Sequence, residues 1–322
     1  MKEIKRVSYA HPDFQVEVDW ILTHRCNYSC SYCRSYDNSK PFLFKTVEQY
    51  SKAFEYLNKY FGGNMSMYIN ILGGEPTLFK KWYLLMNYMG KNNIVPKLTT
   101  NLAVPVDTYI DKLDEKLPPF INGSYHPEFA DLDTFCYNAE KLKERGFLKN
   151  LSLLADPTNW DRTIKIHNRL KKIAPSMNLT KIKNEFTGTL SITEGFIEYT
   201  DDQLKLLDEG NSTEDKYTTV EFKDGTVIHP SQFLLKTKYN KFKGMKCYVG
   251  KYRLHINANG DVFPSACLLN NRRAIMGNIF KENVRRIERP IICPFNACLC
   301  GPDTRIEKER KSDVTKTAEL RS

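Results

Sequence analysis

The chain has 322 residues, of which 41% are hydrophobic, 27% charged and 12% aromatic. This composition is close to that of an average globular protein, so it excludes a disordered chain, a fibrous repeat and a miniprotein that depends on disulfides. The net charge of +10 is unevenly distributed: residues 1–235 carry 29 Lys+Arg against 30 Asp+Glu (net -1), and residues 236–322 carry 19 against 8 (net +11). The basic end can attract an anionic substrate, an acidic electron-donor protein or nucleic acid, or it is simply solvated.

The chain has no apolar run of the roughly 18 residues that a membrane-spanning helix needs, and its start has no apolar signal region, so we expect a cytoplasmic protein with no membrane partner. From residue 16 onward the hydrophobic pattern alternates between strand and helix periods. Predicted strands lie at 16–22, 65–72, 94–100, 120–125, 151–155 and 177–186. Predicted helices lie at 46–61, 78–91, 106–116, 131–145 and 160–173. Six strands that alternate with helices predict parallel pairing in an α/β barrel or partial barrel.

Nine cysteines indicate where the chemistry lies. Their odd number and the missing secretory signal argue against disulfides. Eight of them form two groups, one near each end of the chain, and clustered thiolates in a cytoplasmic protein usually hold metal. The first group is Cys26, Cys30 and Cys33; the second is Cys247, Cys267, Cys293, Cys298 and Cys300. Cys136 stands alone.

The first group forms a C-x3-C-x2-C loop directly after the strand at 16–22. Three thiolates leave one ligand position open, so the loop favours an iron-sulfur cluster with one exposed iron, or a zinc ion with a remote fourth ligand. A second motif, Gly73-Gly74-Glu75-Pro76-Thr77, follows the strand at 65–72. Two glycines let the backbone approach a ligand closely, and a carboxylate can pair with an ammonium group.

Together the two motifs resemble the signature of the radical S-adenosylmethionine (SAM) enzymes. The resemblance implies a partial (β/α)6 barrel and a 4Fe-4S cluster on Cys26, Cys30 and Cys33, whose fourth iron is chelated by SAM. It also implies that Tyr32 faces the adenine of SAM and that Gly73, Gly74 and Glu75 contact its amino group.

Further candidates follow from the rule that reactive groups gather at the carboxyl ends of barrel strands. The resemblance implies that Thr100, Asn101, Ser124 and Asp156 contact the carboxylate and ribose of SAM, although each can instead cap a helix. His126 is a candidate catalytic residue for proton transfer or substrate contact, or an ordinary loop histidine. Cys136 is a candidate hydrogen donor for an epimerisation, although its helix favours a buried core residue.

The second cysteine group surrounds a predicted β-hairpin at Asn259-Gly260, which brings Cys247 and Cys267 together. This arrangement resembles the SPASM and twitch domains of radical SAM enzymes and implies one auxiliary 4Fe-4S cluster, held by Cys247, Cys267 and two of Cys293, Cys298 and Cys300. Structural zinc is the alternative. We therefore predict a radical SAM barrel at 1–190, a linker or substrate-shaping insertion at 191–240 and an auxiliary-cluster domain with a basic tail at 241–322.

The resemblance implies an enzyme that cleaves SAM reductively to a 5'-deoxyadenosyl radical and abstracts hydrogen from a small-molecule or peptide substrate, with the auxiliary cluster assisting oxidation or bond formation. An acidic flavodoxin or ferredoxin is the expected electron donor. One alternative is a radical SAM epimerase. Another is a non-catalytic, zinc-bearing nucleic-acid binder, against which the strand-helix alternation and the Gly73–Glu75 motif argue.

Overall fold

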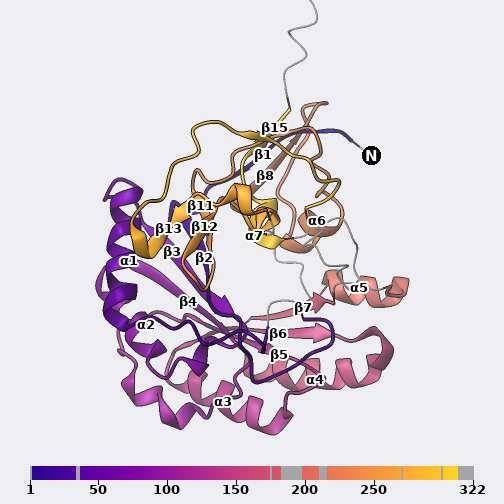
Figure 1. Cartoon of the computed structure of the whole chain (residues 1–322). Coiled ribbons are helices and arrows are strands. Elements are labelled where there is room, and N and C mark those ends of the chain that lie inside the picture. The colour runs from indigo at the N-terminus through magenta and orange to yellow at the C-terminus, as the bar shows by residue number, and fades with distance from the viewer. Residues whose placement is uncertain are drawn as a thin grey trace, which may run out of the picture.

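The computed structural model describes residues 2–33, 37–174, 176–182, 198–209, 216–269, 271–298 and 300–310. Within these residues the largest element is a curved sheet of nine strands, in the order β13-β12-β11-β2-β3-β4-β5-β6-β7 (Figure 1). Its parallel strands are β2 (Val16–Thr23), β3 (Met67–Gly73), β4 (Ile94–Thr100), β5 (Ile121–Tyr125), β6 (Leu148–Ala155) and β7 (Met177–Lys181). The predicted α/β class, with a parallel sheet curved as a partial barrel, is confirmed.

Helices cover the outer face of this sheet (Figure 1). They are α1 (Val47–Tyr60), α2 (Trp82–Lys91), α3 (Leu132–Glu144) and α4 (Trp160–Ile173). Helix α1 begins with a capping box, in which the Thr46 hydroxyl accepts from the Gln49 amide and the Gln49 side chain accepts from the Thr46 amide. Its buried residues Tyr50, Phe54 and Leu57 lie on one side of the helix and join the core.

The predicted helix at 106–116 is wrong. This segment forms two short 3-10 turns, Val106–Thr108 and Ile110–Lys112, separated by Tyr109 at φ -139°. Asn138 on α3 accepts from the Val106 amide at 3.1 Å and donates to the Leu102 carbonyl at 2.8 Å, so a side chain replaces helical backbone partners. The Asp, Thr and Ile residues here have low helix propensity, and tertiary contacts decide the conformation. Of the predicted strand at 177–186, residues 183–186 lie outside the described residues.

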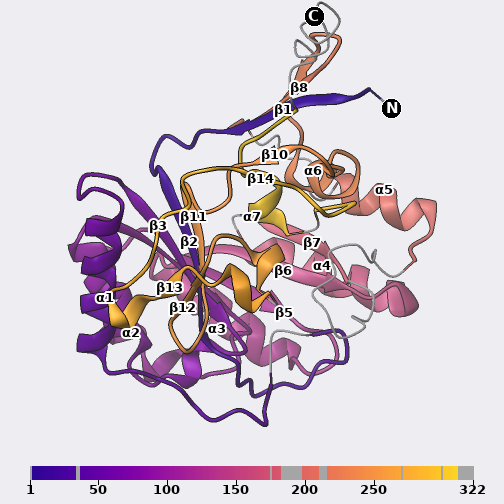
Figure 2. The same cartoon turned by 45° about the horizontal axis from the view of Figure 1, so that its top comes forward.

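A second sheet within the described residues has the order β14-β10-β15-β1-β8-β9 and lies beside the start of β2 (Figures 1 and 2). Its strands are β1 (Ile4–Tyr9), β8 (Thr218–Phe222), β9 (Val227–Ile228), β10 (Lys246–Cys247), β14 (Ile291–Ile292) and β15 (Lys308–Glu309). Strand β1 pairs antiparallel with both β8 and β15. The first strand of the chain is therefore part of a sheet built from its last third.

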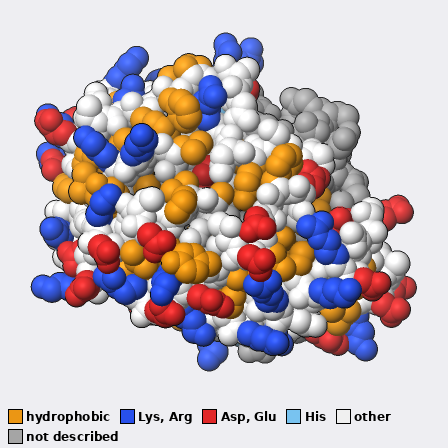
Figure 3. Space-filling model, turned by 90° about the horizontal axis from the view of Figure 1, so that it is seen from below, with side chains coloured by type: hydrophobic (Ala, Val, Ile, Leu, Met, Phe, Trp, Pro, Cys, Tyr) orange, Lys and Arg blue, Asp and Glu red, His pale blue; other side chains and the backbone are white. Residues whose placement is uncertain are grey.

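Helix α5 (Asp201–Glu209) packs near β7, and α6 (Gln232–Thr237) packs against α7 (Gly301–Thr304). None of the helices in the described ranges is long and apolar enough to cross a bilayer. On the face seen in Figure 3, the described Lys and Arg side chains alternate with Asp and Glu around small apolar patches. That face therefore carries a mixed charge pattern instead of a continuous basic surface.

The segment after residue 250 joins the barrel directly. Strand β11 (Arg253–Ile256) extends the main sheet by pairing parallel with β2, and it forms the predicted hairpin with β12 (Asp261–Phe263), while β13 (Gly277–Asn278) adds the outermost strand. The Gly260 turn has φ +91° and its amide donates to the Asn257 carbonyl. The barrel sheet thus continues into the region of the second cysteine group.

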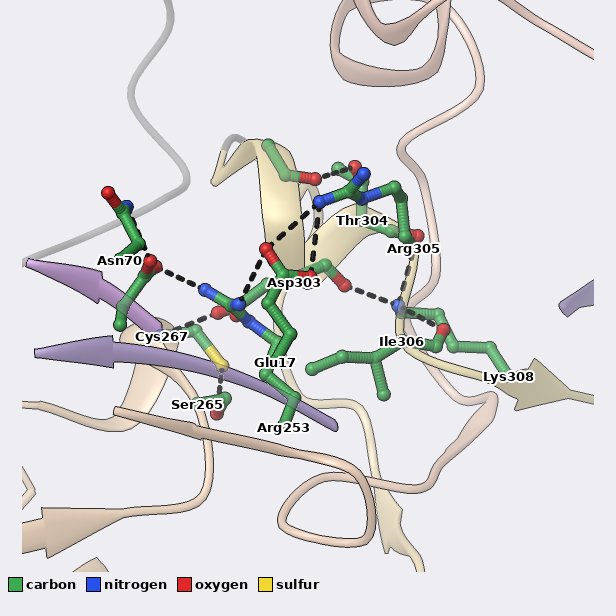
Figure 4. A network of polar contacts seen from close by, with 12 residues as sticks. Glu17, Asn70, Arg253, Ser265, Cys267, Asp303, Thr304, Arg305, Ile306 and Lys308 are labelled. Atoms are coloured by element: carbon green, nitrogen blue, oxygen red, sulfur yellow. Dashed lines mark hydrogen bonds and ion pairs between the residues drawn. The ribbon is translucent and has the colours of Figure 1, made fainter. Parts of the chain in front are cut away.

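Arg253 fixes this junction (Figure 4). Its guanidinium is buried and contacts three carboxylates: Glu17 at 3.2 Å, Asp303 at 2.9 Å, and Asp19. Asp19 also accepts from the Asn70 amide at 2.8 Å. Burial raises the pKa of Asp19, but the Arg253 charge, other nearby basic groups and the Asn70 hydrogen bond together outweigh it and lower that pKa to about 2. Glu17 and Asp19 lie on β2, and Glu17 also pairs with Arg305 at 3.1 Å, so Arg253 and Arg305 together compensate these buried acids of the barrel.

We predict that Arg253→Met destabilises the protein by about 3–5 kcal/mol at pH 7, because it leaves buried carboxylates without their counter-charge. Urea unfolding measures this loss. Arg145→Gln is the matched control, because its pair with Asp111 is exposed and contributes about 1 kcal/mol or less. Equal losses in the two variants would contradict the central role of Arg253.

The same pair predicts a pH dependence. The folded pKa of Asp19 lies below its usual value, so this carboxylate stabilises the fold above about pH 4, and the contribution disappears as the pH falls toward 2. The Arg253→Met variant should lack that contribution, so its stability should fall less steeply over this interval.

Candidate active site

The cysteine loop and the glycine motif line one cavity of about 230 Å³ at the carboxyl ends of the barrel strands. Three thiols, the strand end of β3 and polar side chains from β4 and β5 meet there. The lining residues are Cys26, Tyr28, Cys30, Cys33, Leu72, Gly73, Gly74, Glu75, Thr99, Thr100, Asn101, Ser124, His126 and Leu154. The structure therefore brings together residues that are up to 128 positions apart in the sequence.

Hydrogen bonds at both ends hold the cysteine loop in place. The Cys26 amide donates to Asn38 Oδ1 at 3.0 Å, and the Cys33 amide donates to the Cys30 carbonyl at 3.1 Å. Between them, the Ser31 amide and hydroxyl donate to the Glu128 carboxylate at 2.7 and 2.5 Å. The loop is thus anchored to the turn after β5, and the Ser31–Glu128 contact was not anticipated from the sequence.

The two glycines allow the end of β3 to approach the start of the cysteine loop. A Cβ on Gly73 would lie 2.3 Å from the Thr23 carbonyl oxygen, and one on Gly74 would lie 2.1 Å from the Arg25 carbonyl oxygen. The amides of Gly74 and Glu75 donate to these same two oxygens at 2.8 and 2.9 Å. We had expected close approach to a ligand; the contact seen here is with backbone, and it sets the position of the loop.

Glu75 is fully buried and joins β3 to β4. Its Oε1 accepts from the Thr77 amide at 2.9 Å, from the Thr77 hydroxyl at 2.6 Å and from the Thr100 hydroxyl at 2.8 Å, and its Oε2 accepts from the Asn101 amide at 2.7 Å. Burial raises the pKa of this carboxyl, while its four donors act in the opposite direction. Oε2 carries a single bond, so it retains capacity for a further donor.

His126 lies between the cysteine loop and β5. Its Nδ1 is 3.7 Å from the Cys30 sulfur and 3.2 Å from the Tyr32 hydroxyl, and its ring lies nearly parallel to that of Tyr32. Burial lowers the pKa of His126 to about 4. The imidazole is therefore neutral at pH 7 and can either accept or donate a proton at the cavity edge.

The remaining candidates lie in different surroundings. Ser124 lines the cavity, as do Thr100 and Asn101. Asp156 lies outside it and caps the turn after β6, where its carboxylate accepts from the Thr158 amide and hydroxyl. Cys136 lies on α3 and is buried in the core. Tyr28 is a lining residue that the sequence did not single out; its position inside the cysteine loop was the available signal.

The second cysteine group gathers where β10, the residues after β12 and the residues before α7 meet. The Cys267 amide donates to Asp303 at 3.2 Å and its sulfur lies 3.1 Å from the Ser265 hydroxyl, while the Cys298 and Cys293 amides donate to the Asn240 and Met245 carbonyls. Burial raises the pKa of Cys247 to about 11 and that of Cys267 and Cys300 to about 12.

These thiols also influence one another electrostatically: Cys267 is affected by Cys247 and Cys293, and Cys298 by Cys267 and Cys300. Thiols in such surroundings stay protonated until a metal takes the place of the proton. In the described parts of the chain, no three His, Cys, Asp or Glu side chains surround one point as ligands of a single metal ion.

Comparison with known families supports the first site. Residues 20–126 match the Radical SAM superfamily. This segment is about a third of the chain and contains both the cysteine loop and the Gly73–Glu75 motif. No curated protein is detectably similar to the chain in sequence.

Solved structures extend the likeness to the whole fold. SuiB of Streptococcus suis bound to the precursor peptide SuiA has a TM-score of 0.57 and 16% identity, over 84% of this chain and 64% of that chain. SuiB bound to S-adenosylmethionine has a TM-score of 0.55 and 17% identity over the same shares. A third structure, anSMEcpe with bound AdoMet, has a TM-score of 0.55 and 17% identity, over 83% and 75%. The chain thus shares their fold and spans less than two thirds of SuiB.

We predict that Gly74→Ala prevents the first cysteine loop from taking up iron, because its Cβ forces the loop backbone away, and that it destabilises the protein by about 1–3 kcal/mol or more. Iron analysis after anaerobic reconstitution and thermal melting check both effects. Gly62→Ala is the control: at φ +95° it is strained but meets no atom within 4 Å, so iron uptake should be normal. Normal uptake in Gly74→Ala would contradict the prediction.

Proposed function

We propose that the chain is a radical SAM enzyme that acts on a peptide or a small molecule. The observation that carries the proposal is the single cavity shared by the three loop thiols and the Gly73–Glu75 strand end, inside the segment that matches the superfamily. The solved structures with the same fold add support, because SuiB has a bound precursor peptide and anSMEcpe has bound AdoMet, in one case together with a peptide.

The residues present are suited to the implied groups. Three thiols without a fourth at the same cavity are the donor set of a 4Fe-4S cluster with one open iron, so Cys26, Cys30 and Cys33 would hold it. When bound, this cluster supplies the electron that cleaves SAM into methionine and a 5'-deoxyadenosyl radical, which abstracts hydrogen from the substrate. Glu75, through Oε2, would bind the ammonium group of SAM.

The chain's own residues would orient the reactants. Asn101 donates to Asn27 Oδ1 at 2.8 Å, so the end of β4 is tied to the cysteine loop on the side where SAM would lie. Ser124 and Thr100 would provide hydroxyls for its carboxylate and ribose. Tyr32 does not line the cavity but stacks on His126, which does, and from there it would face the adenine. Neutral His126 would accept or donate a proton at its ring nitrogen, beside the reacting substrate.

We further propose that the second cysteine group holds an auxiliary 4Fe-4S cluster, which would let the enzyme remove a second electron from its substrate. Cys247, Cys293 and Cys298 are buried in one cluster, and Cys267 and Cys300 are close enough to influence Cys298 electrostatically; both observations support this assignment. A peptide substrate is favoured because SuiB and anSMEcpe, which share the fold, are described with bound peptides. An acidic flavodoxin or ferredoxin in the cytoplasm would supply the electrons.

The test is anaerobic purification, assays of iron, sulfide and zinc, and addition of SAM with a strong reductant. About eight irons per chain and release of 5'-deoxyadenosine are expected. We predict that Cys30→Ala abolishes nucleoside release and leaves about four irons per chain, since only the first loop loses a ligand. Ser29→Ala, an exposed residue of the same loop, should behave as wild type. Release that persisted in Cys30→Ala, or two zincs in place of iron, would overturn the proposal.

We also predict that Glu75→Gln weakens SAM binding about tenfold or more while the iron content stays unchanged, because an amide cannot pair with an ammonium as a carboxylate does. Equilibrium binding of SAM to the reconstituted protein measures the effect. Glu48→Gln, an exposed carboxylate on α1, is the control. An unchanged affinity of Glu75→Gln for SAM would show that Glu75 does not bind SAM.

A further inference from the structure

A lysine is buried beside the second cysteine group. Lys308 on β15 is 1% exposed, and its Nζ donates to the carbonyls of Asp303, Thr304 and Ile306 at 2.7, 3.2 and 2.8 Å (Figure 4). The ammonium also lies 4.6 Å from the centre of the Phe242 ring. Its hydrogen bonds are therefore satisfied by neutral groups.

The positive charge of Lys308, in contrast to its hydrogen bonds, has no acidic partner among the described residues. Among the described residues no carboxylate lies within ion-pair distance of its Nζ, whereas buried Arg253 contacts three. The neighbouring acids are paired with other cations: Glu307 with Arg6 and Glu309 with Lys246. Asp303, whose backbone carbonyl Lys308 contacts, uses its carboxylate for Arg253 and the Cys267 amide. A buried ammonium is costly unless an anion compensates it. The fold thus holds a positive charge whose described contacts are all neutral.

The cysteines are the groups that can become anionic at this place. Cys247 pairs with Lys308 in the β10–β15 ladder, and residues directly opposite each other in a ladder point to the same face. Cys247 and Cys298 also belong to one buried cluster with Phe242, the ring that the Lys308 ammonium contacts. Lys308 therefore lies on the side of the sheet where a metal would create thiolates.

We propose that Lys308 is the counter-charge of an anionic metal-thiolate centre built on Cys247, Cys298 and their neighbours. The inference rests on the auxiliary cluster of the proposed function. It adds a residue that tunes the midpoint potential of that cluster. A cluster held by thiolates is negatively charged, and reduction adds one more negative charge. A fixed ammonium at this distance stabilises the thiolate-bound centre and, to a greater extent, its reduced state.

The experiment uses the full chain with Cys26, Cys30 and Cys33 changed to Ala, so that iron reports the second group alone. Lys308→Gln keeps donors for the carbonyls and removes the charge, and Lys308→Arg keeps the charge. Lys246→Gln is the matched control, because Lys246 precedes Cys247 on the same strand, is partly exposed and pairs with Glu309. The measurements are the midpoint potential by EPR-monitored titration, the rate of iron loss to a chelator, and melting with and without the cluster.

We expect Lys308→Gln to shift the midpoint to a more negative potential and to lose iron about tenfold faster, while Lys308→Arg and Lys246→Gln stay near the parent. Lys308→Gln should melt lower than the parent with the cluster bound but equal or higher without it, since removing an uncompensated charge is then favourable.

A Lys308→Gln variant that matches the Lys246→Gln control would overturn the counter-charge role, and so would one that unfolds even without the cluster, because that result shows a purely structural lysine. Failure of the proposed function gives a different result. If the parent protein binds no iron at the second cysteine group, that group does not hold an auxiliary cluster.

Discussion

The junction between β2 and β11 depends on one buried guanidinium. Glu17 and Asp19 project into the barrel from a strand that otherwise supplies apolar residues to the core, and Arg253 pairs with both while it also contacts Asp303. Asp303 in turn accepts from the Cys267 amide. A charge contributed late in the sequence therefore fixes the barrel edge and one member of the second cysteine group at the same time.

Backbone contacts set the position of the cysteine loop in the first site. The end of β3 lies against the Thr23 and Arg25 carbonyls, which is possible because Gly73 and Gly74 lack Cβ atoms, and Glu75 then joins that strand end to β4. The thiols of the loop are positioned as a consequence. In this chain the glycine motif positions the cysteine loop before any ligand is bound.

The sequence predicted the parallel strands, the outer helices and the hairpin at Gly260, because their hydrophobic periods and turn residues are local signals. It also identified most of the polar residues that meet in the first cavity, since the ends of parallel strands share one edge of a sheet, but it missed Tyr28 and wrongly included Asp156. It failed at residues 106–116, where Asn138 from a later helix decides the conformation. The roles of Arg253 and Lys308 could not be predicted either, because the sequence does not show that a single charged residue will be buried or which groups will surround it. The cluster ligation itself stays a prediction.

The pairing of β1 with β15 has a consequence for biosynthesis. Residues 4–9 are made long before the strand at 308–309 that borders them. The parallel strands from 16 to 181 can pair during translation, whereas the second sheet cannot be completed until residues 308–309 have been made. Cys247 lies in that second sheet, so its surroundings are completed only after all the barrel strands have been made.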